Sequence, residues 1–118
     1  CPTNPFGVKM HFYEDGEDVV CFWKPQDNYQ SWVNTLHGGI QSVLLDEVCG
    51  WVVAHMLKAS GVTAKMETRF RKPVAINQPF IELRAPARAE AKYRYRRWRD
   101  TQCRGGNIGG MYMHLFYF

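Results

Sequence analysis

Only one segment of the chain has the length and periodicity of a helix, and its apolar residues lie on almost every side. This segment runs from Ile40 to about Ser60, and Gly61 is a suitable stop after it. A helix that is apolar on most sides has to be covered on most sides, so the other segments must wrap around it. The apolar positions are Ile40, Val43, Leu44, Leu45, Val48, Trp51, Val52, Val53, Met56 and Leu57.

The remaining segments predict β-strands. Residues 8–13 and 19–23 flank an Asp-Gly turn and are expected to form a hairpin, and residues 62–72 form a strand that ends at Pro73. From 79 to 95 the apolar residues occupy one parity, with an interruption at Pro86 that predicts an edge strand or a bulge. Residues 111–118 are apolar at both parities, as in a buried final strand, and the glycine-rich residues 105–110 predict a flexible turn. We therefore expect one α+β domain over residues 1–118, with one long central helix wrapped by a curved antiparallel sheet.

The start of the predicted helix carries residues suited to acyl transfer. His37-Gly38-Gly39 directly precede it, and the first N–H groups of a helix suit an oxyanion. Asp46 lies two turns further on in a run that is otherwise nearly all apolar, where an unpaired carboxylate is costly. An oxyanion donor and a carboxylate are the minimum equipment for hydrolysing an acyl group. The alternative is a tight Gly-Gly turn and a structural carboxylate; Glu47 points about 100° away from Asp46 and is the weaker candidate.

Three features together resemble the hotdog-fold acyl-CoA thioesterases, in the subgroup typified by phenylacetate-degradation thioesterases. They are His37-Gly38-Gly39, the Asp46 that follows nine residues after the His, and the strand from Gly61-Val62-Thr63 to Pro73. The resemblance extends from about Asn4 to Ala85. It implies a hotdog fold and an enzyme that hydrolyses acyl-CoA without a metal or organic cofactor.

The resemblance also implies roles for single residues. Asp46 is expected to be the general base for water or the nucleophile, and the Gly39 N–H the oxyanion donor, while His37 orients the thioester or braces the loop. Thr63 falls where related thioesterases carry a hydroxyl that assists the nucleophilic water, an ordinary strand Thr being the alternative. Several relatives have an Asn six residues before the His, where this chain has Ser31. The substrate-binding candidates are Asn34 and Gly38 near the motif and Arg69, Arg71 and Lys72 for coenzyme A.

The spacing of the two main candidates predicts a dimer. Gly39 and Asp46 are seven residues apart, which places them about 10.5 Å apart along one helix. Both would have to lie about 3 Å from the atoms of one reacting carbonyl. An antiparallel helix of a second chain can bring its own Asp46 beside this Gly39, so we expect a homodimer or a dimer of dimers with composite sites.

Basic residues are concentrated in the second half of the chain. Only Lys9, Lys24 and Lys58 of the 15 Lys and Arg residues precede Lys65, and the net charge is +4. A basic second half of the chain can attract an anionic partner such as acyl-CoA. Alternatively, these basic residues only form the solvated face of a strand. Three other functions fit less well: a non-catalytic acyl-CoA-binding or sensing hotdog domain, a hotdog hydratase or dehydratase that uses His37 and Asp46, and a nucleic-acid-binding module on the Arg-rich segment. We expect no nucleic-acid partner and place no functional residue in 94–110.

The cysteine spacing and the length of the apolar runs indicate the cellular compartment of the protein. The four Cys are widely spaced, which predicts neither a zinc site nor a disulfide framework, and Cys49 is expected to pack as a free thiol. No apolar run reaches the length of a membrane span and no signal peptide is visible, so we expect a cytoplasmic protein. The chain begins at Cys1 without a Met, so we expect further residues upstream.

Overall fold

One helix and six strands make up the regular structure of the part of the chain described by a computed structural model, which covers residues 2–56, 58, 62–86, 99–104 and 112–117. The helix α1 spans Gly38–Trp51 and continues as a π-helical segment, η2, over Val52–Met56. A short 3-10 turn, η1, spans Asp27–Tyr29. The strands are β1 (Phe12–Asp15), β2 (Asp18–Trp23), β3 (Thr63–Lys65), β4 (Ile81–Pro86), β5 (Arg99–Arg104) and β6 (Tyr112–Tyr117).

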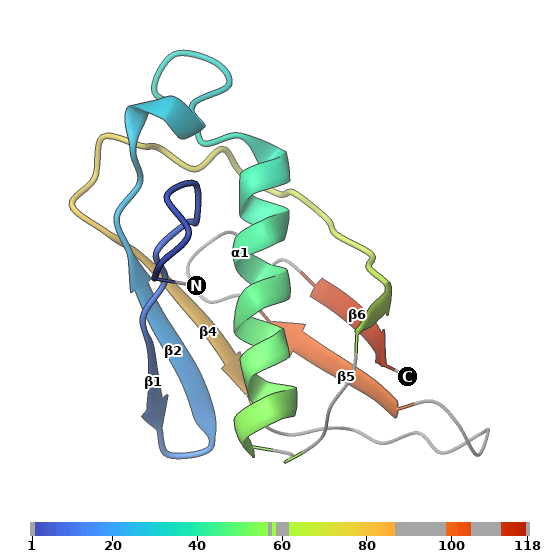
Figure 1. Cartoon of the computed structure of the whole chain (residues 1–118). Helices are drawn as coiled ribbons and strands as arrows, with labels where there is room; N and C mark the ends of the chain where they lie inside the picture. Colours follow the sequence, from blue (N-terminus) through green and yellow to red (C-terminus); the bar gives the residue numbers. More distant parts are fainter. Residues whose placement is uncertain (1, 57, 59–61, 87–98, 105–111, 118) are drawn as a thin grey trace.

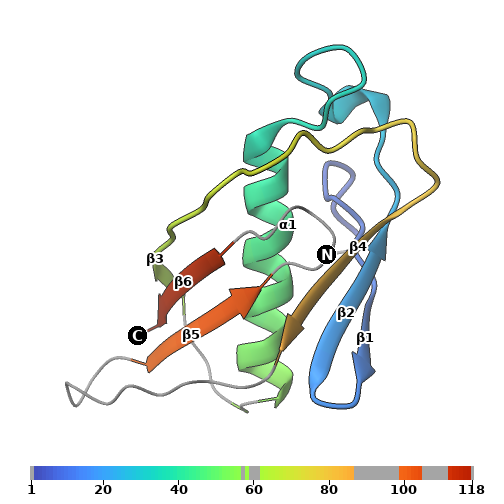
Figure 2. The same cartoon turned by 180° about the vertical axis from the view of Figure 1, so that it is seen from behind.

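The strands form two antiparallel sheets of three strands each, in the orders β1-β2-β4 and β3-β6-β5. The edge strands β4 and β5 lie next to each other, so the two sheets follow one another around the helix (Figures 1 and 2). The helix packs against β2, β4 and β5. This is the predicted α+β arrangement, with one helix against an antiparallel sheet.

The hydrophobic core lies between α1 and the sheet. On the helix Leu44, Leu45 and Val48 are fully buried, and on β4 the alternating residues Ile81, Leu83 and Ala85 point inward, as their parity predicted. Burial of this apolar surface is the main force that holds the helix in the sheet. The loop before the helix adds Leu36 to the core.

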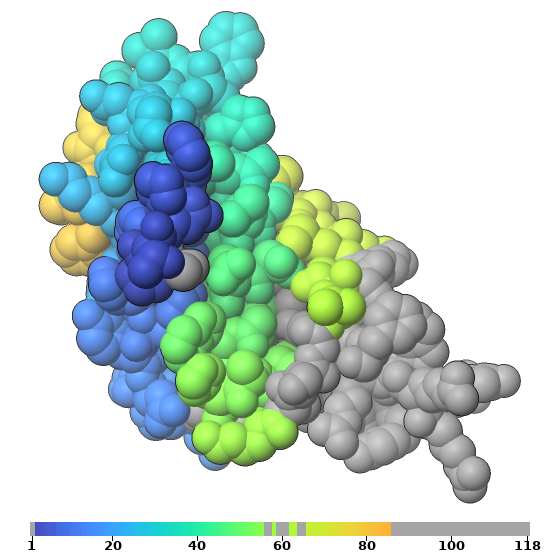
Figure 3. Space-filling model, in the orientation of Figure 1, coloured from blue at the N-terminus to red at the C-terminus, as the bar shows by residue number. Residues whose placement is uncertain are grey.

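One face of α1 is not covered, which corrects the expectation that the helix is buried on most sides. Val43, Glu47, Trp51 and Ala54 are exposed, and the side chains of the helix are visible along its length in Figure 3. These positions recur at helical spacing, so they form one stripe. Within the described part of the chain the Phe12 ring of β1 stacks on Trp51, and the stripe is otherwise exposed at Val43, Glu47 and Ala54.

Several predicted boundaries were wrong. The predicted strand 8–13 begins only at Phe12, and the predicted strand 62–72 is regular only over Thr63–Lys65. The strand β5 was not predicted, because Arg99–Arg104 lacks an apolar alternation. The predicted turn at 105–110 and the continuation of the alternation over 87–95 lie outside the described residues.

The outer face of the first sheet carries an ion cluster. Arg84 on β4 reaches Asp15 at 2.8 Å, Asp18 at 2.9 Å and Glu82 at 3.1 Å. The hydrogen bonds that the Arg84 guanidinium donates to these carboxylates, Asp18 first, raise the pKa of Arg84 above its usual range. Arg84 therefore connects the turn between β1 and β2 to β4.

The two cysteines whose side chains are described differ. Cys21 is a free thiol, and burial raises its pKa, which keeps it protonated and unreactive. Cys49 is disulfide-bonded. The expectation of a free thiol at Cys49 is therefore wrong, because sequence spacing could not show which sulfur atoms the fold brings together.

No helix in the described part of the chain is long and apolar enough to cross a membrane.

Candidate active site

The loop that leads into α1 is fixed by backbone hydrogen bonds to the segment before β4. The Leu36 N–H donates to the Val74 carbonyl at 2.8 Å, and the Ile76 N–H donates to the Asn34 carbonyl at 3.1 Å. The His37 N–H donates to the Tyr29 carbonyl at 2.9 Å. The start of the helix is thus held at a defined place beside the sheet.

His37 is the N-cap of α1. Its Nδ1 atom accepts a hydrogen bond from the Gly39 N–H at 2.9 Å, which satisfies one of the unpaired donors at a helix start. A Cβ atom on Gly39 would lie 3.0 Å from the same Nδ1, so glycine allows this close approach. The predicted oxyanion donor is therefore already engaged, and it can reach a substrate oxygen only when the His37 side chain releases or shares it.

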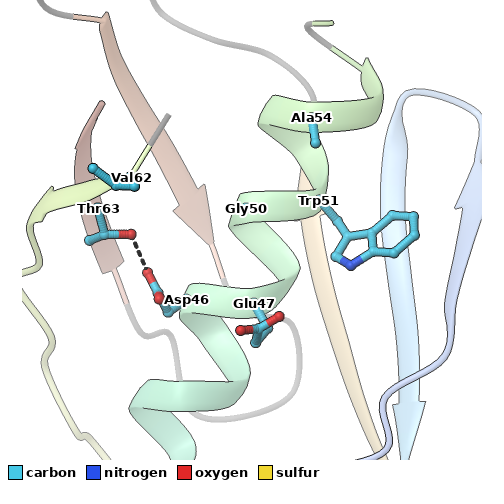
Figure 4. A pocket seen from close by; sticks show the side chains of 7 residues that line it. All are labelled: Asp46, Glu47, Gly50, Trp51, Ala54, Val62 and Thr63. Atoms are coloured by element: carbon cyan, nitrogen blue, oxygen red, sulfur yellow. Dashed lines mark hydrogen bonds between the residues drawn. The ribbon is translucent and has the colours of Figure 1, made fainter. Parts of the chain in front are cut away.

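Asp46 and Thr63 are brought together by the fold. The Thr63 hydroxyl on β3 donates to Asp46 Oδ1 on α1 at 2.6 Å, and Figure 4 shows the two side chains pointing toward each other. A short bond of this kind to a carboxylate is among the stronger protein hydrogen bonds. Two residues chosen separately in the sequence, 17 positions apart, thus form one pair.

A pocket of about 420 Å³ surrounds this pair. Its volume lies within the usual range for small-molecule sites. In Figure 4 Trp51 points to the opposite side of the helix from Asp46, and Gly50 lies on the helix between them. The lining residues are Asp46, Glu47, Gly50, Trp51, Ala54, Val62 and Thr63.

The Trp51 indole is held in place by stacking on both sides. The centroid of its ring lies 4.6 Å from the Phe12 ring centroid and 3.9 Å from the His55 ring centroid, and the ring planes are nearly parallel. Stacked aromatic rings restrict each other's rotation and add to the energy of burial. Trp51 is therefore a fixed wall of the pocket, although 36% of its surface is exposed.

The other predicted residues lie away from this pocket. Asn34 is exposed with φ +58°, and its N–H donates to Gln30 Oε1 at 2.8 Å. Arg69, Arg71 and Lys72 are exposed on the extended segment between β3 and β4. This segment passes the helix start, where a Cβ atom on Gly38 would lie 3.4 Å from the Phe70 ring.

Four pocket residues were not predicted as site residues: Gly50, Trp51, Ala54 and Val62. Helical spacing places Gly50 one turn after Asp46, where the sequence already predicts room for a ligand, and the same spacing could have identified Ala54, two turns after Asp46. Trp51 was assigned to the core, because an aromatic residue on an apolar helix is usually buried.

A metal centre has no support within the described ranges, where no group of three His, Cys, Asp or Glu side chains could hold an ion.

Comparisons with known proteins extend this description. Residues 33–85 match the family model described as the thioesterase superfamily. This range contains His37, Asp46, Thr63 and every other residue that lines the pocket. A comparison with curated proteins found no match.

Solved structures similar to this chain show the same fold. AziG of S. sahachiroi has a TM-score of 0.73 and 14% identity over 93% of this chain and 90% of that chain. A phenylacetic acid degradation-related protein from Ralstonia eutropha JMP134 has a TM-score of 0.69 and 16% identity over 94% and 86%. A hypothetical thioesterase protein with coenzyme A from Streptococcus pneumoniae TIGR4 has a TM-score of 0.68 and 16% identity over 92% and 84%. The predicted hotdog fold is confirmed.

Proposed function

We propose that this chain is an acyl-CoA thioesterase, which hydrolyses a thioester to a free acid and coenzyme A. The observation that carries the proposal is the Asp46–Thr63 pair in its pocket. The family model over residues 33–85 and the similar pneumococcal structure with coenzyme A support the same function. The subgroup typified by phenylacetate-degradation thioesterases is part of the proposal, and the similar Ralstonia structure supports it.

The hydrogen bonds of the pair suit the activation of water. Thr63 donates its only hydroxyl proton to Asp46 Oδ1, so its oxygen can only accept further hydrogen bonds. A water that donates one proton to Thr63 and the other to the second Asp46 oxygen presents a lone pair to the thioester carbon. Asp46 then takes the proton of the attacking water as general base. Direct attack by Asp46 through an anhydride is the alternative course, and the same hydrogen bond orients the carboxylate for it.

The oxyanion donor in this proposal is the Gly39 N–H of a second chain. Gly39 and Asp46 lie on the same helix, Gly38–Trp51, and are about 10.5 Å apart along its axis. The exposed stripe of α1 gives a second, antiparallel helix a place to approach. His37 would hold the Gly39 N–H until the thioester oxygen replaces its Nδ1 atom.

The remaining predicted roles complete the proposal. Arg69, Arg71 and Lys72 would contact the phosphates of coenzyme A, since all three are exposed close to the helix start. Gly38 and Asn34 would contact the thioester end of the substrate. The enzyme would act as a homodimer or dimer of dimers, without a metal or organic cofactor.

The test is a thiol-release assay over a panel of acyl-CoAs with wild type and two carboxylate variants. Asp46→Asn is expected to lower kcat by about 10²–10⁴-fold, or about 3–5 kcal/mol of barrier, because the base is lost while the side-chain shape is kept. Glu47→Gln is the matched control, because Glu47 lines the same pocket, and it is expected to change kcat by less than about tenfold.

The result also separates this function from its rivals. Near wild-type turnover by Asp46→Asn would remove Asp46 from the mechanism, and a larger loss in Glu47→Gln would make Glu47 the reactive carboxylate. Tight acyl-CoA binding without thiol release would indicate a binding or sensing domain. An enoyl or hydroxyacyl product without thiol release would indicate a hydratase.

A further inference from the structure

Gly50 lies inside α1, where glycine weakens a helix relative to alanine. The backbone does not require glycine here, because Gly16 is the one described glycine with positive φ. Packing does not require it either, because an added Cβ atom at Gly50 would meet nothing within 4 Å among the described residues. Gly39 differs in this respect, since a Cβ atom there would lie only 3.0 Å from His37 Nδ1.

The empty space beside Gly50 belongs to the pocket. Gly50 follows Asp46 by one helical turn, and the pocket continues from it to Trp51, Ala54 and Val62. Among the described lining residues, this end of the pocket is mainly apolar and has no positively charged side chain to pair with a phosphate. This end of the pocket therefore suits the acyl chain of a thioester whose carbonyl lies at Asp46 and Thr63, rather than its coenzyme A part.

We propose that Gly50 determines which acyl groups the pocket accepts, by leaving room for a bulky or long acyl group beside the carbonyl. The proposal rests on the proposed function. It names the substrate class as medium-chain or aromatic acyl-CoA rather than acetyl-CoA.

The experiment compares wild type, Gly50→Ala and Gly50→Leu with acetyl-, octanoyl- and phenylacetyl-CoA in a thiol-release assay. The Leu side chain would occupy the free space, so kcat/KM for octanoyl- and phenylacetyl-CoA is expected to fall at least about tenfold relative to acetyl-CoA. Gly50→Ala should give a smaller shift in the same direction. Phe22→Trp is the control, because it adds bulk at an exposed residue of β2 that lies off α1 and does not line the pocket, and it should leave the ratio within about twofold.

A binding measurement keeps this proposal separate from the proposed function. The same variants are titrated by calorimetry with non-hydrolysable thioether analogues of the three acyl-CoAs, and oligomeric state is measured by light scattering. If wild type releases no thiol, the proposed function has failed. A Gly50→Leu variant whose Kd for the octanoyl and phenylacetyl analogues rises at least about tenfold relative to the acetyl analogue would still support the role of Gly50. An equal loss for all acyl groups, an unchanged ratio in Gly50→Leu, or a change of oligomeric state in Gly50→Ala overturns the proposal.

Discussion

The hydrogen bond between Thr63 and Asp46 gives the sharpest prediction for a single residue. Replacing Thr63 by Val keeps the shape and removes the hydroxyl, and the residue is exposed, so the fold should be unaffected. Hydrogen bonds to charged groups contribute about 1.5–3 kcal/mol, which predicts a loss of about 10–100-fold in kcat.

Thr63→Ser is the matched control, because it keeps the hydroxyl and should retain kcat within a few-fold. Steady-state thiol release measures both variants. Full activity of Thr63→Val would mean that the Thr63 hydroxyl has no role in catalysis.

Sequence reasoning identified the residues of this pair but not their contact. Asp46 was predicted because a carboxylate in a nearly all apolar helix is costly unless it is paired or used, and Thr63 because of a resemblance. Their hydrogen bond depends on where β3 returns along the helix, which no local pattern specifies. The bond from Gly39 to His37 was missed for a similar reason, since it depends on a side-chain torsion at the helix start.

The helix α1 starts with an unusual N-cap, which allows a prediction about stability. His37→Ala removes the acceptor of the Gly39 N–H and is expected to lower the free energy of unfolding by about 1 kcal/mol. His37→Asn should lose less, because Asn is a good N-cap. Urea denaturation with a common slope measures the difference, and equal losses in both variants would show that the cap contributes nothing.

The sheet offers a second prediction, at Arg84. Arg84→Met removes the cation that connects the turn between β1 and β2 to β4, so Tm should fall at low salt. The difference from wild type should shrink in 1 M salt, because partly exposed ion pairs are screened. Arg69→Met, on the exposed segment, is the control for the loss of one positive charge.

The pH dependence of this contribution follows from the sign of the shift. The pKa of Arg84 is raised in the folded state, so its contribution is fully present below the unfolded pKa and is lost only as pH rises through the folded pKa. The Tm difference between wild type and Arg84→Met should therefore persist from neutral pH into the alkaline range. A difference that disappears between pH 7 and 9 would contradict this assignment.

Elements with strong periodicity were predicted well from the sequence. The hairpin partner 19–23, the inward parity of β4 and the existence of the helix all follow from residue patterns. The strand β5 could not be predicted, because Arg99–Arg104 is mostly polar and lacks an apolar alternation, although it pairs with β6, the next strand along the chain. The π-helical segment Val52–Met56 has no local sequence signature either.

At the scale of the whole molecule, the exposed stripe of α1 leads to a test of the proposed composite site. Gly39→Pro removes the proposed oxyanion N–H, and Asp46→Ala removes the base, so each homodimer should be inactive. Refolding the two variants together gives about half heterodimers by random pairing. One site in each heterodimer combines an intact Gly39 with an intact Asp46, so the mixture should recover up to about a quarter of wild-type activity.

The controls for this test are the two variants refolded separately and mixed afterwards. Mass spectrometry of the intact complexes shows whether heterodimers have formed. Heterodimers that remain at the background activity of the homodimers would rule out the shared site.

The uncovered stripe of α1 has a further consequence for how such an enzyme would behave when it is scarce. If each site needs groups from two chains, a separated chain has no complete site, and the rate per molecule depends on how many molecules are present. Dilution below the dissociation constant of the dimer would then slow turnover more steeply than the protein concentration falls. A cell could set the hydrolysis rate by its level of synthesis alone, with a threshold below which its acyl thioesters are left intact.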